Sequence, residues 1–203
     1  MPLICTKHLY SLHNWDAPEA ILQRGLIYQL IEKESKLLTE CNRIIELDPQ
    51  NQEAILLRGK TYQFMKRYPE ALADFDRAID LDPKDNWLHY NRALAHIGLK
   101  QPENAKADLI QALQLAQPNY DKNPNNHRNT FNLALYYLVA RQPEKAKLLY
   151  QNALSREAPT ERIKAAIQDL KDLLIILPNH PNIQEMQGFL ESALSLRQPS
   201  PQP

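Results

Sequence analysis

The fold of this chain is decided by one stretch, which reads Glu53-Ala54-Ile55-Leu56-Leu57-Arg58-Gly59-Lys60-Thr61-Tyr62-Gln63. Residues 19–29 are a close copy of it, and Gly59 follows Gly25 by 34 residues. A third copy arrives on the same period at residues 91–93. A fixed period of this size is typical of stacked supersecondary units, each of which buries its apolar face against its neighbours. The sequence therefore predicts a repeat protein that presents a shaped surface and is not an enzyme.

The composition restricts the class further. The 203 residues carry 24 basic and 24 acidic side chains, and this balance argues against nucleic-acid binding, which depends on neutralising phosphates. Leu and Ala are abundant whereas Val139 is the sole valine, so helix is favoured over sheet. We predict an all-α fold, a right-handed α-solenoid.

Nothing in the sequence resembles a targeting or membrane segment. The N-terminal residues lack a charged-then-apolar pattern, and no apolar run approaches the ~20 residues of a membrane helix. Cys5 and Cys41 lie far apart, as is usual for small buried hydrophobes in a reducing compartment. We expect a cytoplasmic protein without membrane insertion.

Each unit is expected to be a pair of antiparallel helices. In the second unit, apolar and small residues recur at spacings of three and four, which predicts helices at about 52–65 and 68–81. Residues 65–68 supply the turn, and Pro83 follows the end of the second helix. Small side chains such as Gly59 let the two axes approach within ~8–10 Å.

At these residues the chain resembles the tetratricopeptide repeat, or TPR, family. Residues 52–85 fill every position of the family pattern with Gly59, Tyr62, Ala71, Phe75, Ala78 and Pro83. The resemblance implies an array over 18–159 with four units, of which the first is degenerate and the third is looser: 18–51, 52–85, 86–117 and 127–159.

The segments outside the units are predicted from their composition. The fourth unit arrives seven residues late, and the excess lies in the polar, turn-rich segment 118–126. We expect an inserted loop there, either as a tolerated insertion or as part of a binding face. The remaining predictions are an N-terminal cap at 1–17, capping helices at 160–197 and a disordered tail at 198–203.

A second periodic signal consists of charges. Three arginines repeat with the period, and an acid follows each of them by sixteen residues: Arg24 with Glu40, Arg58 with Asp74, and Arg92 with Asp108. In the fourth unit both members change together, to Leu133 and Leu149. We predict structural ion pairs between the two helices of a unit, because the guanidinium can meet a carboxylate in bidentate geometry. The alternative is that the six charges face solvent.

The TPR resemblance implies that the first helices of the units line a concave groove. The groove residues expected to bind a protein or peptide partner are Leu56, Lys60, Gln63, Trp87, Tyr90, Asn91, Leu94, Arg128, Phe131 and Leu135. Their apolar and aromatic character suits an amphipathic helix or an extended apolar segment. In the alternative reading, the chain's own terminal helix packs into the groove and makes Trp87 and Phe131 core residues.

One specialised form of the family is not expected. Relatives that bind chaperone tails grip a C-terminal carboxylate with a clamp of Lys, Asn and Arg. Only Lys60, Asn91 and Arg128 fall near that frame, and Leu56 stands where a clamp Lys should be.

No chemistry-bearing motif is recognisable. The six histidines have no metal-binding spacing, the four glycines are too dispersed for a phosphate loop, and the cysteines lack a nucleophile signature. We predict no catalytic residues, no metal site and no cofactor.

A second reading comes from residues 129–203. The run 129–136, followed by 169–174 and 177–181, looks similar to the TPR tails of large bacterial signalling ATPases. This resemblance implies a bacterial origin and a sensor or regulatory module that works with an ATPase or protease. RNA reading by related 35-residue repeats fits poorly with the neutral charge and the 34-residue period.

Overall fold

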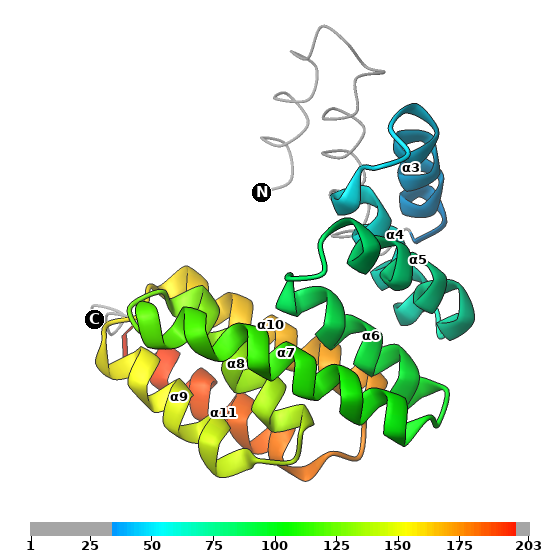
Figure 1. The fold of residues 1–203 in the computed structure, drawn as a ribbon. Coiled ribbons are helices and arrows are strands. Elements are labelled where there is room, and N and C mark those ends of the chain that lie inside the picture. Colours follow the sequence, from blue (N-terminus) through cyan, green and yellow to red (C-terminus); the bar gives the residue numbers. More distant parts are fainter. Residues whose placement is uncertain (1–33, 198–203) are drawn as a thin grey trace, which may run out of the picture. The chain divides into compact units, whose positions relative to one another are not determined.

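The computed structural model describes residues 34–197, and these residues form α-helices joined by short turns (Figure 1). They divide into two units, which belong to residues 1–83 and 84–203 and are described separately. The predicted N-terminal cap at 1–17, most of the first helix of the 18–51 repeat including Arg24, and the tail at 198–203 lie outside the described residues.

In its described part, residues 34–83, the first unit contains a helical hairpin preceded by helix α3 (Glu34–Leu47). Helix α3 packs against α4 (Gln52–Phe64), which forms the hairpin with α5 (Tyr68–Leu81). The predicted helices agree with α4 and α5 to within one residue. Helix α4 begins at residue 52 because the Asn51 side chain caps it, accepting a hydrogen bond of 3.0 Å from the Ala54 N–H.

The second unit contains three hairpins. They are α6 (Asn86–Gly98) with α7 (Pro102–Lys122), α8 (His127–Val139) with α9 (Pro143–Ser155), and α10 (Thr160–Ile176) with α11 (Pro181–Ser195). Helix α7 packs against α8, and the last hairpin lies on the one before it, with α10 on α8 and α11 on α9 (Figure 1). One apolar core runs through all six helices.

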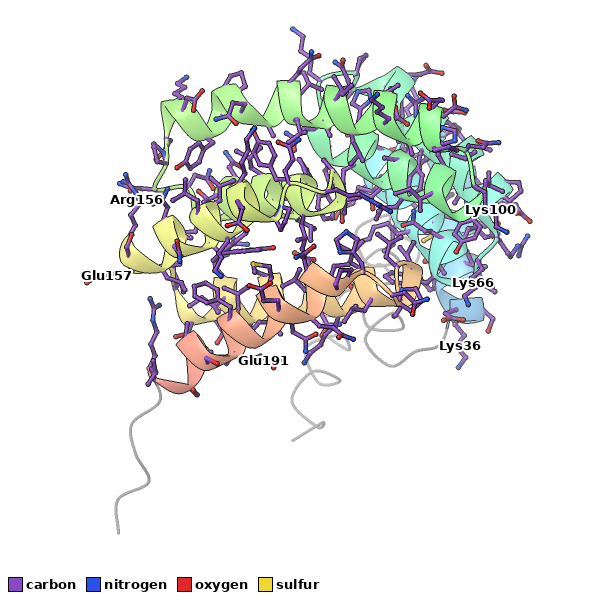
Figure 2. The ribbon with its side chains drawn as sticks, turned by 90° about the horizontal axis from the view of Figure 1, so that it is seen from below. Lys36, Lys66, Lys100, Arg156, Glu157 and Glu191 are labelled. Carbon is purple, nitrogen blue, oxygen red and sulfur yellow. The ribbon has the colours of Figure 1, made fainter. Side chains whose placement is uncertain are left out.

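The turns of the first three described hairpins share one backbone conformation. Lys66, Lys100 and Arg141 have φ near +60°, and the N–H of each following residue returns to a carbonyl five residues earlier, as Arg67 N–H does to Tyr62 O at 2.8 Å. This is the Schellman ending of a helix, which usually places glycine at the left-handed position. Figure 2 labels Lys66 and Lys100 on their turns. Here long basic side chains occupy these positions at some cost in backbone strain.

The predicted loop at 118–126 is wrong for its first five residues, because α7 continues to Lys122. Helix α7 has 21 residues whereas α5 has 14, so the seven extra residues lengthen the helix by about two turns. Pro118 lies inside the helix, and the extension is tied to the next hairpin on both sides of it. Tyr137 Oη donates to Gln117 at 3.0 Å, and Asn152 Nδ2 donates to Tyr120 Oη at 3.3 Å. These contacts offset the local preference of proline for a break.

Candidate functional site

The predicted partners Arg58 and Asp74 lie in contact across the α4–α5 hairpin. Arg58 donates from Nε to Asp74 Oδ2 at 2.8 Å and from Nη2 to Oδ1 at 2.5 Å, which is the bidentate geometry. A third bond runs from Arg58 Nη1 to Asn42 Oδ1 of α3 at 2.7 Å. Asp74 is only 3% exposed, so its carboxylate depends on this arginine for the interactions that water would otherwise supply.

The α6–α7 hairpin repeats the arrangement and adds two imidazoles. Arg92 donates from Nε and Nη2 to Asp108 at 2.9 and 2.7 Å. His89 Nδ1 and His96 Nε2 each lie 3.7 Å from a carboxylate oxygen of Asp108, beyond hydrogen-bond distance. His96 Nδ1 instead lies 2.7 Å from Gln101 Oε1. Asp108 is therefore a buried anion with one bidentate partner.

The α8–α9 hairpin carries no charge at the same two positions. Leu133 and Leu149 are both buried, and they belong to the common core of the second unit. In the remaining predicted pair, Glu40 lies on α3, whereas Arg24 falls outside the described residues. The two described ion pairs each join the two helices of one hairpin.

The predicted groove residues of the first unit lie on α4. Leu56 and Lys60 are half-buried, and Gln63 is buried. Phe64, one residue further on, is also half-buried. This face of α4 therefore combines an apolar and a cationic side chain that solvent can reach.

The predicted groove residues of the second unit are mostly core. Tyr90, Asn91, Leu94, Phe131 and Leu135 are all buried, Trp87 is half-buried, and Arg128 is exposed. The prediction of an open groove over α6 and α8 is therefore wrong for the five buried residues. Four of these, all except Asn91, belong to the same core as the apolar stripe of α10, formed by Ile163, Ala166, Ile167, Leu170 and Leu173.

Aromatic rings form the centre of this covered face. Tyr90 stacks on Tyr136 with ring centroids 4.7 Å apart and on Trp87 at 5.1 Å. Tyr136 Oη donates to Asn86 Oδ1 at 2.7 Å, which joins α8 to the start of α6. Burial, with the carboxylates of Asp169 and Asp172 nearby, raises the pKa of Tyr90 well above its ordinary value. Both carboxylates are on α10, which packs on α8.

The sequence contained a signal for this cover. Helix α10 has an apolar stripe as broad as that of a core helix, and its partner α11 buries Ile183, Met186 and Leu190. Figure 2 shows side chains filling the space between α8 and the α10–α11 hairpin. The alternative reading named the terminal helix, which is α11, but α11 packs on α9, and the helix that lies on α8 is α10.

The described residues contain neither a candidate metal site nor a candidate membrane span. Within 34–197, no three His, Cys, Asp or Glu side chains are grouped so that they could hold a metal ion. No helix in the same range has the length and apolar character needed to cross a bilayer.

Sequence comparison identifies the repeats directly. Residues 53–85 and residues 88–119 each match a model described as tetratricopeptide repeat. These two segments correspond to the α4–α5 and α6–α7 hairpins. No curated protein matches the chain in sequence.

Several solved structures share the fold. A thermophilic TPR protein of Thermus thermophilus is 19% identical, with a TM-score of 0.56, over 87% of this chain and 100% of that one. MamA from Desulfovibrio magneticus RS-1 is 19% identical over 75% and 85% of the two chains, with a TM-score of 0.51. An O-GlcNAc transferase of Thermobaculum terrenum is 24% identical, with a TM-score of 0.52, over 71% of this chain but only 27% of the transferase.

At these identities the likeness concerns the fold alone. Together with the two matching segments, it confirms the predicted all-α fold of TPR-like helical hairpins. The α4–α5 and α6–α7 hairpins are tetratricopeptide repeats, and the chain has the helical-hairpin fold of an α-solenoid.

Proposed function

We propose that this chain is a non-catalytic protein-interaction scaffold that binds an apolar segment of a partner protein, helical or extended, on the concave face of α4. The observation that supports this surface is the contrast between the two units. Leu56 and Lys60 on α4 are partly exposed. The corresponding apolar residues on α6 and α8 are buried in the core of the second unit. We place this function in the cytoplasm, in keeping with the separated cysteines.

The chemistry of the α4 face suits such a segment. Leu56 and Phe64 supply apolar surface two helical turns apart, and Lys60 lies between them on the same face of α4. Apolar anchors with a charge beside them are typical of surfaces that receive an amphipathic segment. The two matching segments support the general role, because tetratricopeptide repeats are typically interaction modules without catalytic activity.

The experiment compares two exposed leucines on different faces. Leu56→Asp places a charge on the α4 face, and Leu148→Asp makes the same change on α9, where the side chain is 57% exposed. Proteins captured by the wild-type chain from a bacterial lysate should be lost with Leu56→Asp and retained with Leu148→Asp, at equal thermal stability of the two variants. If both variants keep the same companions, the α4 face is not the binding surface.

The sensor reading remains the alternative within this proposal. A regulatory module of a bacterial ATPase or protease would use the same face, but its captured companion would be that enzyme. Identification of the protein lost with Leu56→Asp separates the two roles: a companion with no enzymatic activity favours the scaffold, and an ATPase or protease favours the regulatory module.

A further inference from the structure

We propose that the α10–α11 hairpin is a tethered occupant of the apolar face of α6 and α8, and that the face binds an amphipathic helix from a partner when this hairpin opens. The inference rests on the proposed interaction role and assigns a second surface to it. The ligand is an amphipathic helix with an apolar stripe like that of α10.

The α10–α11 hairpin is attached to the other described helices through one interface. Within the described residues, the hairpin packs on the one before it, through α10 on α8 and α11 on α9. In an array of repeats, stability is shared between nearest neighbours, so opening of this hairpin would break its interface with the α8–α9 hairpin.

Polar contacts also hold the hairpin closed. Lys147 of α9 pairs with Glu185 of α11 at 3.1 Å, and both side chains are largely exposed. Arg197 donates to the Ala158 and Leu154 carbonyls near the end of α9. Exposed pairs of this kind contribute little in water. The hairpin is therefore held mainly by apolar packing, which another apolar helix can replace.

Opening of the hairpin would expose an apolar face on α6 and α8. Tyr90 and Leu94 on α6, with Phe131 and Leu135 on α8, form a face of aromatic and aliphatic side chains. The tyrosine rings of this face are held in place by stacking and by the bond from Tyr136 to Asn86. The face is thus preformed, and a partner helix would meet rigid anchors, which favours affinity.

The chemistry of the partner follows from α10 itself. Its buried stripe has residues at spacings of three and four, from Ile163 through Leu173. A competing helix should therefore present a similar apolar stripe.

The first experiment uses the wild-type chain and measures backbone hydrogen exchange. Amides of α10 and α11 should exchange at least tenfold faster than amides of α8, because the hairpin opens without unfolding its neighbour. If the two sets exchange at the same rate, the hairpin is permanent core and the inference is overturned. Equal exchange rates would leave the proposed role of α4 unaffected. That role is tested separately by the comparison of Leu56→Asp with Leu148→Asp.

The second experiment uses a fluorescein-labelled peptide with the sequence of residues 160–176. A tethered helix has an effective concentration in the millimolar range, so the wild-type chain should bind the free peptide weakly. The full-length variant Ile167→Asp plus Leu170→Asp should bind it at least tenfold more tightly, because both side chains are buried in the closed hairpin. The control Ala165→Asp plus Gln168→Asp alters exposed positions of α10 and should behave as wild type.

Two further measurements test the same interface. A peptide that carries the same two substitutions, Ile167→Asp and Leu170→Asp, should not bind. If the variant chain keeps exchange protection in α6–α9 yet binds no peptide, the inference is overturned. If the variant loses that protection, the hairpin is required for folding of its neighbours, which also overturns it.

Discussion

The α6–α7 and α8–α9 hairpins have the same backbone plan but join their two helices with opposite chemistry. In the first, Arg92 and Asp108 form a bidentate ion pair with Asp108 buried, and in the second, Leu133 and Leu149 occupy the corresponding positions. Replacing a buried ion pair by apolar residues of similar volume is often neutral or stabilising, whereas removing one partner is costly. We therefore expect these two positions to accept either a charged pair or an apolar pair, but not one member of each.

The largest expected effect comes from mixing the two chemistries. Arg92→Leu should destabilise the protein by about 3–5 kcal/mol, because Asp108 keeps a buried charge without its bidentate partner. The double variant Arg92→Leu plus Asp108→Leu should return to within about 1 kcal/mol of wild type, as the α8–α9 hairpin suggests. Urea unfolding followed by circular dichroism measures both.

The control for this cycle is an exposed pair. Lys147→Leu breaks the contact with Glu185 and should cost about 0–1 kcal/mol. If the double variant is as unstable as Arg92→Leu alone, the α6–α7 hairpin requires the ion pair for its stability. Leucines at these positions would then not replace the ion pair as they do in the α8–α9 hairpin.

A smaller effect concerns how closely the helices approach. The α4–α5 hairpin has Gly59 where α6 and α8 have Ala93 and Ala134, both buried. A Cβ at residue 59 would lie 2.8 Å from Phe75 Cε1 and 3.1 Å from Asp74 Cβ. Gly59→Ala should therefore cost about 1–3 kcal/mol, since the fully buried Phe75 ring has little room to move.

Gly188 supplies the matched change. A Cβ there meets nothing within 4 Å, so Gly188→Ala in α11 should stabilise by about 0.5–1 kcal/mol through helix propensity. Thermal unfolding of the two variants should shift in opposite directions. A stabilised Gly59→Ala protein would contradict this prediction. It would mean that α4 and α5 can move apart enough to accommodate the added methyl group.

The smallest expected effects concern the positive-φ residues in the hairpin turns. Lys66→Gly and Arg141→Gly should each stabilise by about 0.5 kcal/mol, because glycine relieves the positive φ but increases the entropy of the unfolded chain. Gln151→Gly, inside α9, is the control and should destabilise by about 1 kcal/mol. Denaturant midpoints decide the matter, and a loss of stability at Lys66 or Arg141 would show that the basic side chain has a role that outweighs the strain.

The repeat could be predicted from the sequence because its evidence is periodic. The bounds of α4 and α5, and the partner of each arginine in the described hairpins, follow from residues that recur 34 apart. Local composition was misleading at Pro118, where proline and asparagine favour a loop but contacts from Tyr137 and Asn152 hold the helix. Tertiary contacts of this kind leave no trace in a local pattern.

The groove prediction was wrong for a different reason. Apolar side chains at the concave positions of α6 and α8 are equally suited to a partner and to a helix of the same chain. Only the packing of α10 on α8 distinguishes the two. Sequence reasoning identified the surface but could not identify what covers it.

The extension of α7 has a consequence for how such arrays change in length. An α-helix makes two turns in 7.2 residues, so an insertion of seven rotates the following residues by only about 20°. The reach of the helix grows by about 10 Å while the facing of its side chains is almost preserved. Insertions of seven, unlike those of five or nine, can thus add a spacer to one hairpin and leave its neighbours able to dock as before.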